Sequence, residues 1–279
     1  MAETVTYVDS LGTSHTLSAN ARYLRGDGVD VWHVEPVMDE LYGEWDSVAG
    51  YDVRGHELSL EFAISASSYD NARATLATWR QAFMRDVSRF KHTTSALGTL
   101  VVIHNGGTYT QWDVANATPE IRGPDGNYIG VTLKWQTRSP FWKYNATAST
   151  VSAFASTTPV WVSYSNTGDY DTWPIHKLTG ACGTPTITDS VSGDYIQIGT
   201  AWAGTADQVW VWTNPPLIRY YAGGTAAGTK TAGTNLTGYA GTVSTFFELQ
   251  VGAGSVSLYA ASGSAAYTLD YDILKAGLG

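Results

Sequence analysis

The chain has 279 residues, of which 43% are hydrophobic and 15% charged, with 11 tryptophans, 17 tyrosines and 29 glycines. This length suits two domains, and the composition is typical of folded, β-rich proteins with many turns rather than of disordered chains. A net charge of −9 argues against a protein that binds nucleic acid through its phosphates. The single cysteine, Cys182, excludes an internal disulfide.

The N-terminal residues carry neither a basic start nor an apolar run, so we expect no secretion signal. No stretch approaches the roughly 20 apolar residues of a membrane helix, so we expect no transmembrane segment. The sequence therefore predicts a protein that is made and kept in a cytoplasm.

Charge is distributed unevenly along the chain. The segment 26–61 holds ten carboxylates against one basic residue, Arg54, whereas 73–91 holds five basic residues against one acidic. Beyond residue 145 only four basic and eight acidic residues remain. This shift predicts a domain boundary near 145, with one domain at 1–145 and a second at 146–279.

One strand and one helix stand out in the first half. Between Glu57 and Ile64 apolar and polar residues alternate, which predicts a strand with one buried face. Between Tyr69 and Lys91 apolar residues recur every three or four positions, among them Trp79 and Phe83. This spacing predicts an amphipathic helix whose apolar stripe lies on a sheet.

Strands are expected over the rest of the chain. In the first half we place them at 99–104, 108–114 and 128–136, with the first two joined in a hairpin, whereas 145–158 is typical of a linker or an edge strand. In the second half strands are predicted at 160–165, 175–179, 184–188, 194–199, 208–213, 217–221, 245–251, 255–260 and 266–274. Short strands at this spacing indicate a sandwich of two antiparallel sheets, so the predicted fold class is mainly β with one helix (α+β).

Motifs of catalysis and metal binding are missing from the sequence. The six histidines lack ligand spacing, no glycine-rich phosphate loop precedes a helix, and no Gly-x-Ser-x-Gly elbow occurs. Cys182 has no basic neighbour in sequence, which indicates an inert thiol. Asp169 and Asp171 could in principle act as the carboxylate pair of a glycoside hydrolase. They lie beside a glycine in a turn, so we interpret them as solvated turn residues instead. We therefore expect no enzyme, no cofactor and no metal site.

Tryptophans are the stronger candidates for a binding function. In Val209-Trp210-Val211-Trp212 the two indoles lie on one face of a strand. We favour core for them, because large aromatic side chains are usually buried, over an open face that stacks on sugar rings. Trp202 lies in a Gly/Ala-rich loop, where we expect it to be exposed. Carbohydrate binding by Trp202, Trp210 and Trp212 is therefore the alternative function.

The segment 166–180 combines a polar turn with Trp173 and Pro174. Pro174 suits the start of a strand, where its missing N–H does no harm, and we expect Trp173 to pack against the adjoining sheet. We interpret this segment as scaffold rather than as a ligand site. Trp173→Ala is expected to cost about 3 to 5 kcal/mol if the ring is fully buried.

The order of these features resembles the distal tail proteins (Dit) of long-tailed siphophages. In the first half the resemblance rests on the arginine-led strand Arg54 to Leu60, the helix from Tyr69, Leu97-Gly98-Thr99-Leu100, the hairpin strand 109–114 and Ser139-Pro140-Phe141-Trp142. In the second half it rests on Asn166 to Asp169, Pro174-Ile175, Gly180, Asn214 to Leu217, 249–254 and 265–272. It covers residues 50–279.

This resemblance implies a structural virion protein at the tail tip, assembled in the host cytoplasm. Such proteins form a hexameric ring through the N-terminal domain, at the junction of tail tube and tail tip, and display a galectin-like β-sandwich outward. The implied partners are further copies of the chain, the tail tube protein and a tail-tip hub or tail-associated lysin protein, with host-surface polysaccharide for the alternative function.

In such a ring, genome DNA passes through the centre without specific binding, and an acidic lumen would repel it. The acidic segment is the candidate lining of that lumen. Its candidate residues are Asp27, Asp30, Glu35, Asp39, Glu40, Glu44 and Asp46.

Overall fold

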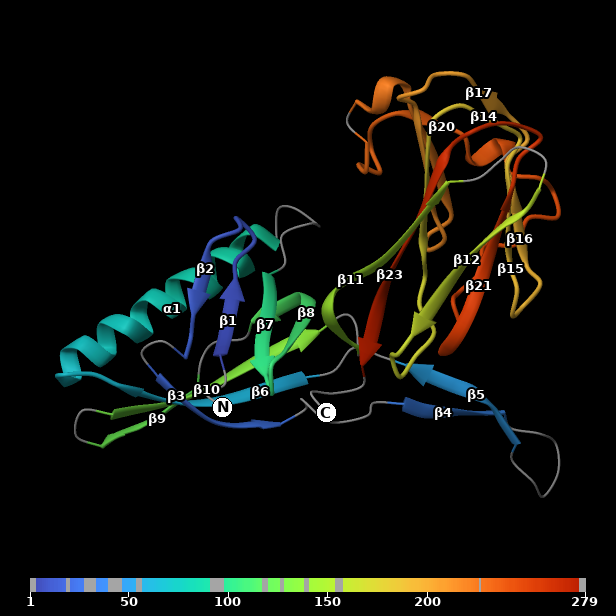
Figure 1. Ribbon diagram of the computed structural model, residues 1–279. Helices are drawn as coiled ribbons and strands as arrows, with labels where there is room; N and C mark the ends of the chain where they lie inside the picture. The colour runs from blue at the N-terminus through green and yellow to red at the C-terminus, as the bar shows by residue number, and fades with distance from the viewer. Residues whose placement is uncertain are drawn as a thin grey trace. The chain divides into compact units, whose positions relative to one another are not determined.

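The computed structural model describes residues 4–18, 21–27, 34–39, 47–53, 57–90, 98–116, 120–125, 128–137, 141–153, 158–225 and 227–275. The chain divides into two compact units: Met1–Asn145 with Lys275–Gly279 form unit 1, and Ala146–Leu274 form unit 2. Both units are built mainly of antiparallel strands, and one α-helix occurs among the described residues (Figure 1). This confirms the expected fold class, mainly β with one helix.

Unit 1 contains the helix and the first strands of the chain. Its elements are β1 (Thr4–Val8), β2 (Ser14–Thr16), β3 (Ala21–Asp27), β4 (Val34–Asp39), β5 (Ser47–Val53), β6 (Glu57–Ser65), α1 (Tyr69–Phe90), β7 (Gly98–His104), β8 (Gly107–Asn116), β9 (Glu120–Asp125), β10 (Tyr128–Thr137) and the start of β11 (Trp142–Ala153).

The strands of unit 1 form two antiparallel groups that meet at β8. In one group the order is β2-β1-β7-β8, and in the other β3-β6-β10, with β9 also on β10 and β10 pairing the end of β8. The turn between β7 and β8 is the predicted hairpin, with Asn105 and Gly106 both at positive φ. The strand predicted at 57–64 is β6, and its apolar residues are buried as their alternation requires.

Helix α1 covers this sheet with the predicted apolar stripe. Trp79 and Phe83 are both buried; the Trp79 ring meets Phe62 of β6 at 5.6 Å and the Phe83 ring meets Trp135 of β10 at 6.2 Å, both edge to face. Such aromatic pairs favour T-shaped geometry because the ring edge is positive and the face negative. The helix begins where Ser68 Oγ accepts a hydrogen bond from the Asn71 N–H.

Strands β4 and β5 form a separate hairpin. They pair with each other over six residue pairs, from Val34 with Val53 to Asp39 with Ser47. Among the described strands neither β4 nor β5 pairs with any other. For this segment the sequence suggests no role other than the one based on its acidic residues.

Unit 2 consists of strands and two short 3-10 turns. Its elements are the end of β11, β12 (Val160–Asn166), β13 (Ile175–Thr179), β14 (Cys182–Gly183), β15 (Thr186–Asp189), β16 (Tyr195–Gln197), β17 (Ala201–Trp202), β18 (Gln208–Trp212), β19 (Leu217–Tyr221), η1 (Ala222–Gly224), β20 (Thr234–Asn235), η2 (Thr237–Tyr239), β21 (Gly252–Tyr259), β22 (Ser262–Gly263) and β23 (Ala266–Lys275).

Two antiparallel sheets of unit 2 enclose a core. One has the order β12-β21-β15-β16, and the other contains β11-β23-β13-β18-β19-β20. Inward residues of both sheets are buried in one cluster, for example Ile187 and Val256 from the first and Leu178, Val211 and Leu269 from the second. This is the predicted sandwich, because every strand presents alternate residues to the same interior.

One strand expected in unit 2 is absent from the structure. Segment 245–251 is not a strand: it makes one isolated bridge, between Thr172 and Leu249. Its alternating pattern reflects burial of Phe247 and Leu249 rather than a hydrogen-bonded ladder. For segment 145–158, expected to be a linker or an edge strand, the strand alternative holds over residues 145–153, which belong to β11.

Candidate functional site

Trp202 is not exposed, so that expectation is wrong. Its side chain is 8% exposed, and its indole N–H donates a hydrogen bond of 2.7 Å to the Gly180 carbonyl oxygen. Strand β17 holds the residue in place by pairing Trp202 with Cys182 of β14. The Gly180 carbonyl satisfies the one polar atom of the indole, which burial would otherwise leave without a hydrogen-bond partner.

Trp210 and Trp212 lie together on the outer face of β18. The valines that alternate with them, Val209 and Val211, point into the sandwich core, so the indoles occupy the opposite face. The two ring centroids are 5.7 Å apart. This removes the interpretation of the indoles as part of the core between the sheets.

The protein's own groups cover these two rings. The Lys177 ammonium lies 4.3 Å from the Trp210 ring centroid and forms an ion pair with Asp270. A Cβ added at Gly228 would lie 2.9 Å from the Trp210 ring, so the backbone of this loop packs against the indole. The Lys230 ammonium from the same loop lies 5.8 Å from the Trp212 ring centroid, and Trp212 is only 5% exposed. The pair is therefore not an open surface for sugar stacking.

The turn that begins at Asn166 is fastened to the rest of unit 2. The buried Asn166 amide donates to the Tyr170 and Leu249 carbonyl oxygens at 2.9 and 3.2 Å, and its oxygen accepts the Gly168 N–H at 3.0 Å. Asp171 accepts the Val251 N–H at 2.8 Å. These bonds join distant segments, which fits the interpretation as scaffold.

Pro174 and Trp173 follow this turn. Pro174 comes directly before β13, and its carbonyl oxygen accepts a hydrogen bond of 2.8 Å from the Thr213 hydroxyl. Trp173 is 39% exposed, so its ring is not fully buried and the larger stability cost does not apply. Partial burial lowers the cost because less apolar surface leaves water.

The candidate lumen residues fall partly within the described chain. Asp27 lies on β3, and Glu35 and Asp39 lie on β4. The other four candidates lie outside the described residues: Asp30, Glu40, Glu44 and Asp46.

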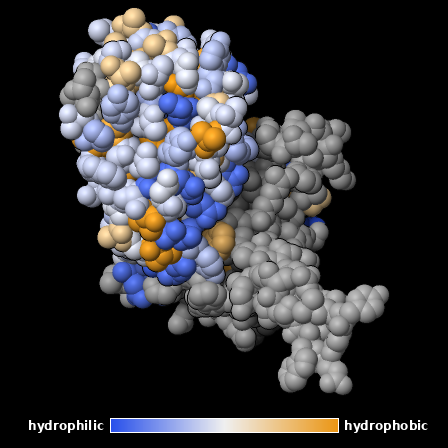
Figure 2. All heavy atoms as spheres, turned by 90° about the vertical axis from the view of Figure 1, so that its right-hand side faces the viewer, coloured by the Kyte–Doolittle hydropathy of each residue, from blue (hydrophilic) through white to orange (hydrophobic). Residues whose placement is uncertain are grey.

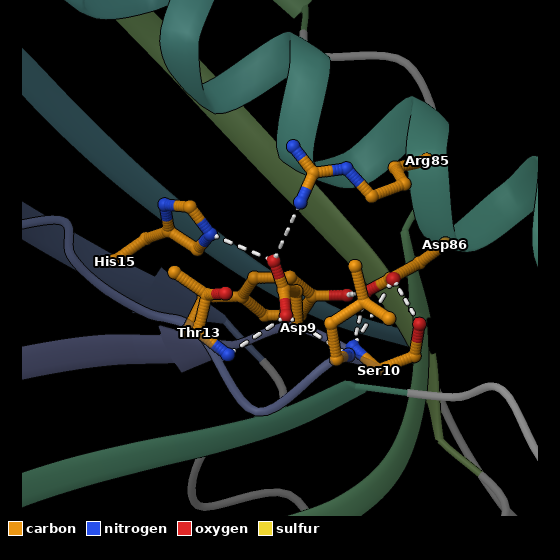
Figure 3. A network of polar contacts seen from close by, with 8 residues as sticks. Asp9, Ser10, Thr13, His15, Arg85 and Asp86 are labelled. Atoms are coloured by element: carbon orange, nitrogen blue, oxygen red, sulfur yellow. Dashed lines mark hydrogen bonds and ion pairs between the residues drawn. The ribbon is translucent and has the colours of Figure 1, made fainter.

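A polar cluster that the sequence analysis missed joins the β1–β2 hairpin to α1. In Figure 3 the carboxylates of Asp9 and Asp86 lie between the hairpin turn and the helix, with Arg85 and His15 on either side of Asp9. Asp9 accepts bonds from His15 Nε2 at 3.1 Å and Arg85 at 3.3 Å, and from the Thr13 N–H at 2.9 Å. Burial alone would raise the pKa of Asp9, but the hydrogen bonds from His15 and backbone N–H groups outweigh it, so the pKa is lowered.

Asp86 completes this cluster from the helix side. It accepts a hydrogen bond from the buried Tyr7 hydroxyl and a second from the Ser10 N–H at 3.1 Å. Burial is the main cause, and the hydrogen bond to Asp86 a smaller one, that raises the pKa of Tyr7 well above its ordinary value. Gly98 of the Leu-Gly motif lies against the same tyrosine, since a Cβ there would come within 2.3 Å of the Tyr7 oxygen. The cluster is a clamp that fixes the hairpin to the helix.

Other titratable groups do not assemble into a reactive site in the described ranges. Burial raises the pKa of Cys182 to about 12, so the thiolate is suppressed. Burial lowers the pKa of His176 to about 3, so its imidazole is neutral, and Nδ1 shares a 2.7 Å hydrogen bond with the Tyr267 hydroxyl. Among the residues the structure describes, no group of three or more His, Cys, Asp or Glu could hold a metal ion.

No helix among the described residues, α1 included, has both the length and the apolar character to cross a bilayer.

Trp161 is a well exposed tryptophan that the sequence analysis did not single out. Trp161 on β12 is 56% exposed and lies on the opposite face from the buried Val162 and Tyr164. Alternation along 160–165 was the signal that could have found it, because it places residue 161 on the face away from the core.

Comparisons with known proteins identify solved structures of similar fold. No family model and no curated protein matches the sequence. The crystal structure of phage SPP1 Dit (gp 19.1), described as a paradigm of the hub adsorption apparatus in phages that infect Gram-positive hosts, matches with a TM-score of 0.66 and 13% identity, over 97% of this chain and 99% of that chain.

Two structures of the phage p2 baseplate in its activated conformation, with Sr and with Ca, also match. Each gives a TM-score of 0.51 and 7% identity, over 97% of this chain and 98% of that chain. At these identities the likeness concerns the fold. It confirms, at that level, the resemblance to phage distal tail proteins.

Proposed function

We propose that this protein is a structural component of a phage tail, a distal tail hub that joins the tail tube to the tail tip. The observation that carries the proposal is the fold match to SPP1 Dit, which extends over 97% of this chain and 99% of that one. A match confined to the sandwich would have supported only a shared β-module, because sandwiches serve many functions.

The hub is expected to be a hexameric ring built through residues 1–145. Strands β4 and β5 support this expectation, since they pair only with each other among the described strands. An isolated two-stranded hairpin is marginally stable in water, so this one would gain stability by packing on a neighbouring copy. Head-to-tail contacts of this kind close into rings when the rotation between copies allows it.

The acidic segment would line the passage for the genome. Asp27 on β3 and Glu35 and Asp39 on β4 belong to it, and their negative charge would keep DNA from adhering during transit. A reconstruction of the assembled ring that places these carboxylates on its outer rim would refute this part of the proposal.

Unit 2 would be the outward, galectin-like sandwich of the hub. The partners proposed are the tail tube protein on one side of the ring and a tail-tip hub or tail-associated lysin protein on the other. We propose no catalytic role. The Asp171 carboxylate is held in a hydrogen-bonded turn, and the raised pKa of Cys182 disfavours the thiolate that a nucleophile needs.

The mass of the full chain in solution tests the ring. Native mass spectrometry should find about 180 kDa, which is six copies of the 30.0 kDa chain, and class averages in electron microscopy should show six-fold symmetry. A second experiment labels phage particles with antibodies to this chain, and the label should sit at the distal end of the tail. Label along the tube or on the capsid, together with a strictly monomeric chain at high concentration, would refute the hub.

A further inference from the structure

The outer face of the sheet β12-β21-β15-β16 carries an unusual set of side chains. Strand alternation sends Val162, Ile187, Ile196 and Leu258 into the core and turns their neighbours to the outside. Apart from Ala253, the outward residues are aromatic or carry hydroxyl or amide groups, among them Trp161, Thr186, Thr188, Tyr195, Gln197 and Tyr259.

The register of the strands arranges these side chains in rows. Trp161 pairs with Ser257, Ser257 with Thr188, and Thr188 with Tyr195, which makes one row with an aromatic ring at each end. With neighbouring strands about 4.8 Å apart, the row is roughly 14 Å long. That length accommodates a short oligosaccharide rather than a single sugar ring.

A second row lies beside the first. Thr186 pairs with Tyr259 on one side and with Gln197 on the other, two residues further along the same strands. Tyr259 is 40% exposed, so the face presents aromatic rings in both rows. The side chains of one sheet face within two residues of each other lie close enough to contact one extended ligand.

Two threonine hydroxyls of β15 lie between the rings. Thr186 and Thr188 are partly exposed and their hydroxyls make no hydrogen bond to another described residue, whereas Ser257 is buried, with 7% exposure. A hydroxyl both donates and accepts, as the hydroxyls of a sugar do, so the two threonine hydroxyls can bond a sugar directly or through water. The rings can stack on the apolar C–H faces of the same sugars.

Charge excludes several other ligands. The outward positions of these four strands carry no Asp, Glu, Lys or Arg, although the chain has a net charge of −9. A surface for an anionic polymer needs Lys or Arg, and a surface for a cationic one needs carboxylates. The face suits a neutral ligand.

A protein partner fits this face less well. Protein interfaces have an apolar centre of packed side chains, often with Arg. Figure 2 shows the side of unit 2 on which β15, β16 and β21 lie, and strongly hydrophobic residues there form separate spots rather than one continuous patch. Aromatic rings with small hydroxyl residues between them match a sugar chain better than a protein surface.

We propose that this face of unit 2 binds a neutral polysaccharide, with Trp161 as the principal stacking residue. The site is distinct from the tryptophans at 202, 210 and 212, whose rings are buried or covered. It is independent of the ring, because all of its residues lie in one sheet of unit 2.

Affinity electrophoresis of the full-length protein tests the proposal. The gels contain a neutral polysaccharide, namely dextran, a galactan, a mannan or a rhamnan, or polygalacturonate as an anionic comparison. At least one neutral polymer should retard the protein, and polygalacturonate should not. Trp161→Ala should weaken binding to the retarding polymer about tenfold or more, because a stacking contact is lost.

Two variants make the result specific. Trp161→Phe keeps an aromatic ring and should retain affinity to within about threefold. Trp173→Ala removes another partly exposed tryptophan of unit 2 outside this face, and should bind as the original protein does. Circular dichroism on each variant verifies that it is folded.

The proposal is overturned if none of the neutral polymers retards the protein, if Trp161→Ala binds as tightly as the original, or if Trp173→Ala loses as much affinity. It is also overturned if Trp161→Ala changes only the mass of the assembly, since that marks the face as a contact between copies. Ring formation is measured on the same samples, so failure of the sugar site and failure of the hub are distinguished.

Discussion

The buried imidazole of His176 should make the stability of unit 2 depend on pH. The side chain lies in the sandwich interior, stacked on Tyr267 at 6.0 Å and edge to face with Phe247 at 5.4 Å between ring centroids. Its Nε2 has no hydrogen-bond partner among the described residues. Burial disfavours the charged imidazolium and so lowers the pKa of His176 to about 3.

The sign of the effect follows from proton binding. In the unfolded chain His176 has its ordinary pKa of about 6.5, so between that value and about 3 the unfolded state carries a proton that the folded state lacks. The contribution of His176 to the free energy of unfolding should therefore be constant above about pH 6.5 and fall by about 1.4 kcal/mol for each pH unit below it. From pH 7.5 to 5.0 the loss is about 2 kcal/mol.

Urea titration with a brief pulse of hydrogen exchange measures this loss in unit 2 alone. The peptides to follow span β13 and β18, which pair through His176 and Val211. Reading these peptides avoids treating two units as one cooperative transition.

The matched variant is His176→Phe together with Tyr267→Phe, which removes the imidazole and the hydroxyl that would lose its partner. Other titrating groups act equally in both proteins, so the difference between the two pH profiles isolates His176. Identical slopes between pH 6.5 and 5.0 would show that the imidazole is protonated in the fold, and would refute the reasoning.

Three further predictions concern stability and reactivity. Asp86→Ala should lower the free energy of unfolding of unit 1 by about 2 to 3 kcal/mol in urea titrations, because the Tyr7 hydroxyl and the Ser10 N–H lose their acceptor; an unchanged midpoint would contradict the clamp. Trp173→Ala should cost only about 1 to 2 kcal/mol by the same measurement, less than the 3 to 5 typical of a buried tryptophan. Cys182 should resist a thiol reagent at pH 8 until urea unfolds the protein, and rapid labelling of the native chain would show that the thiol is accessible.

The sequence by itself determined the elements whose periodicity is local. Alternation over residues 57–64 and the three-to-four spacing over 69–91 correspond to β6 and α1 because both patterns depend only on backbone geometry and on having one buried face. The Asn-Gly turn at 105–106 is of the same kind, since positive φ is a property of the residues themselves.

Only the tertiary structure decided which aromatic rings are open. Trp202 is buried because the Gly180 carbonyl, 22 residues away, accepts its N–H, and Trp210 is covered by Lys177 from another strand. Asp86 meets Ser10 across 76 residues of chain. Periodicity predicts which side chains of a strand share a face. It does not predict what covers that face, because the covering residues come from segments far away in sequence. Their position depends on the packing of the whole unit.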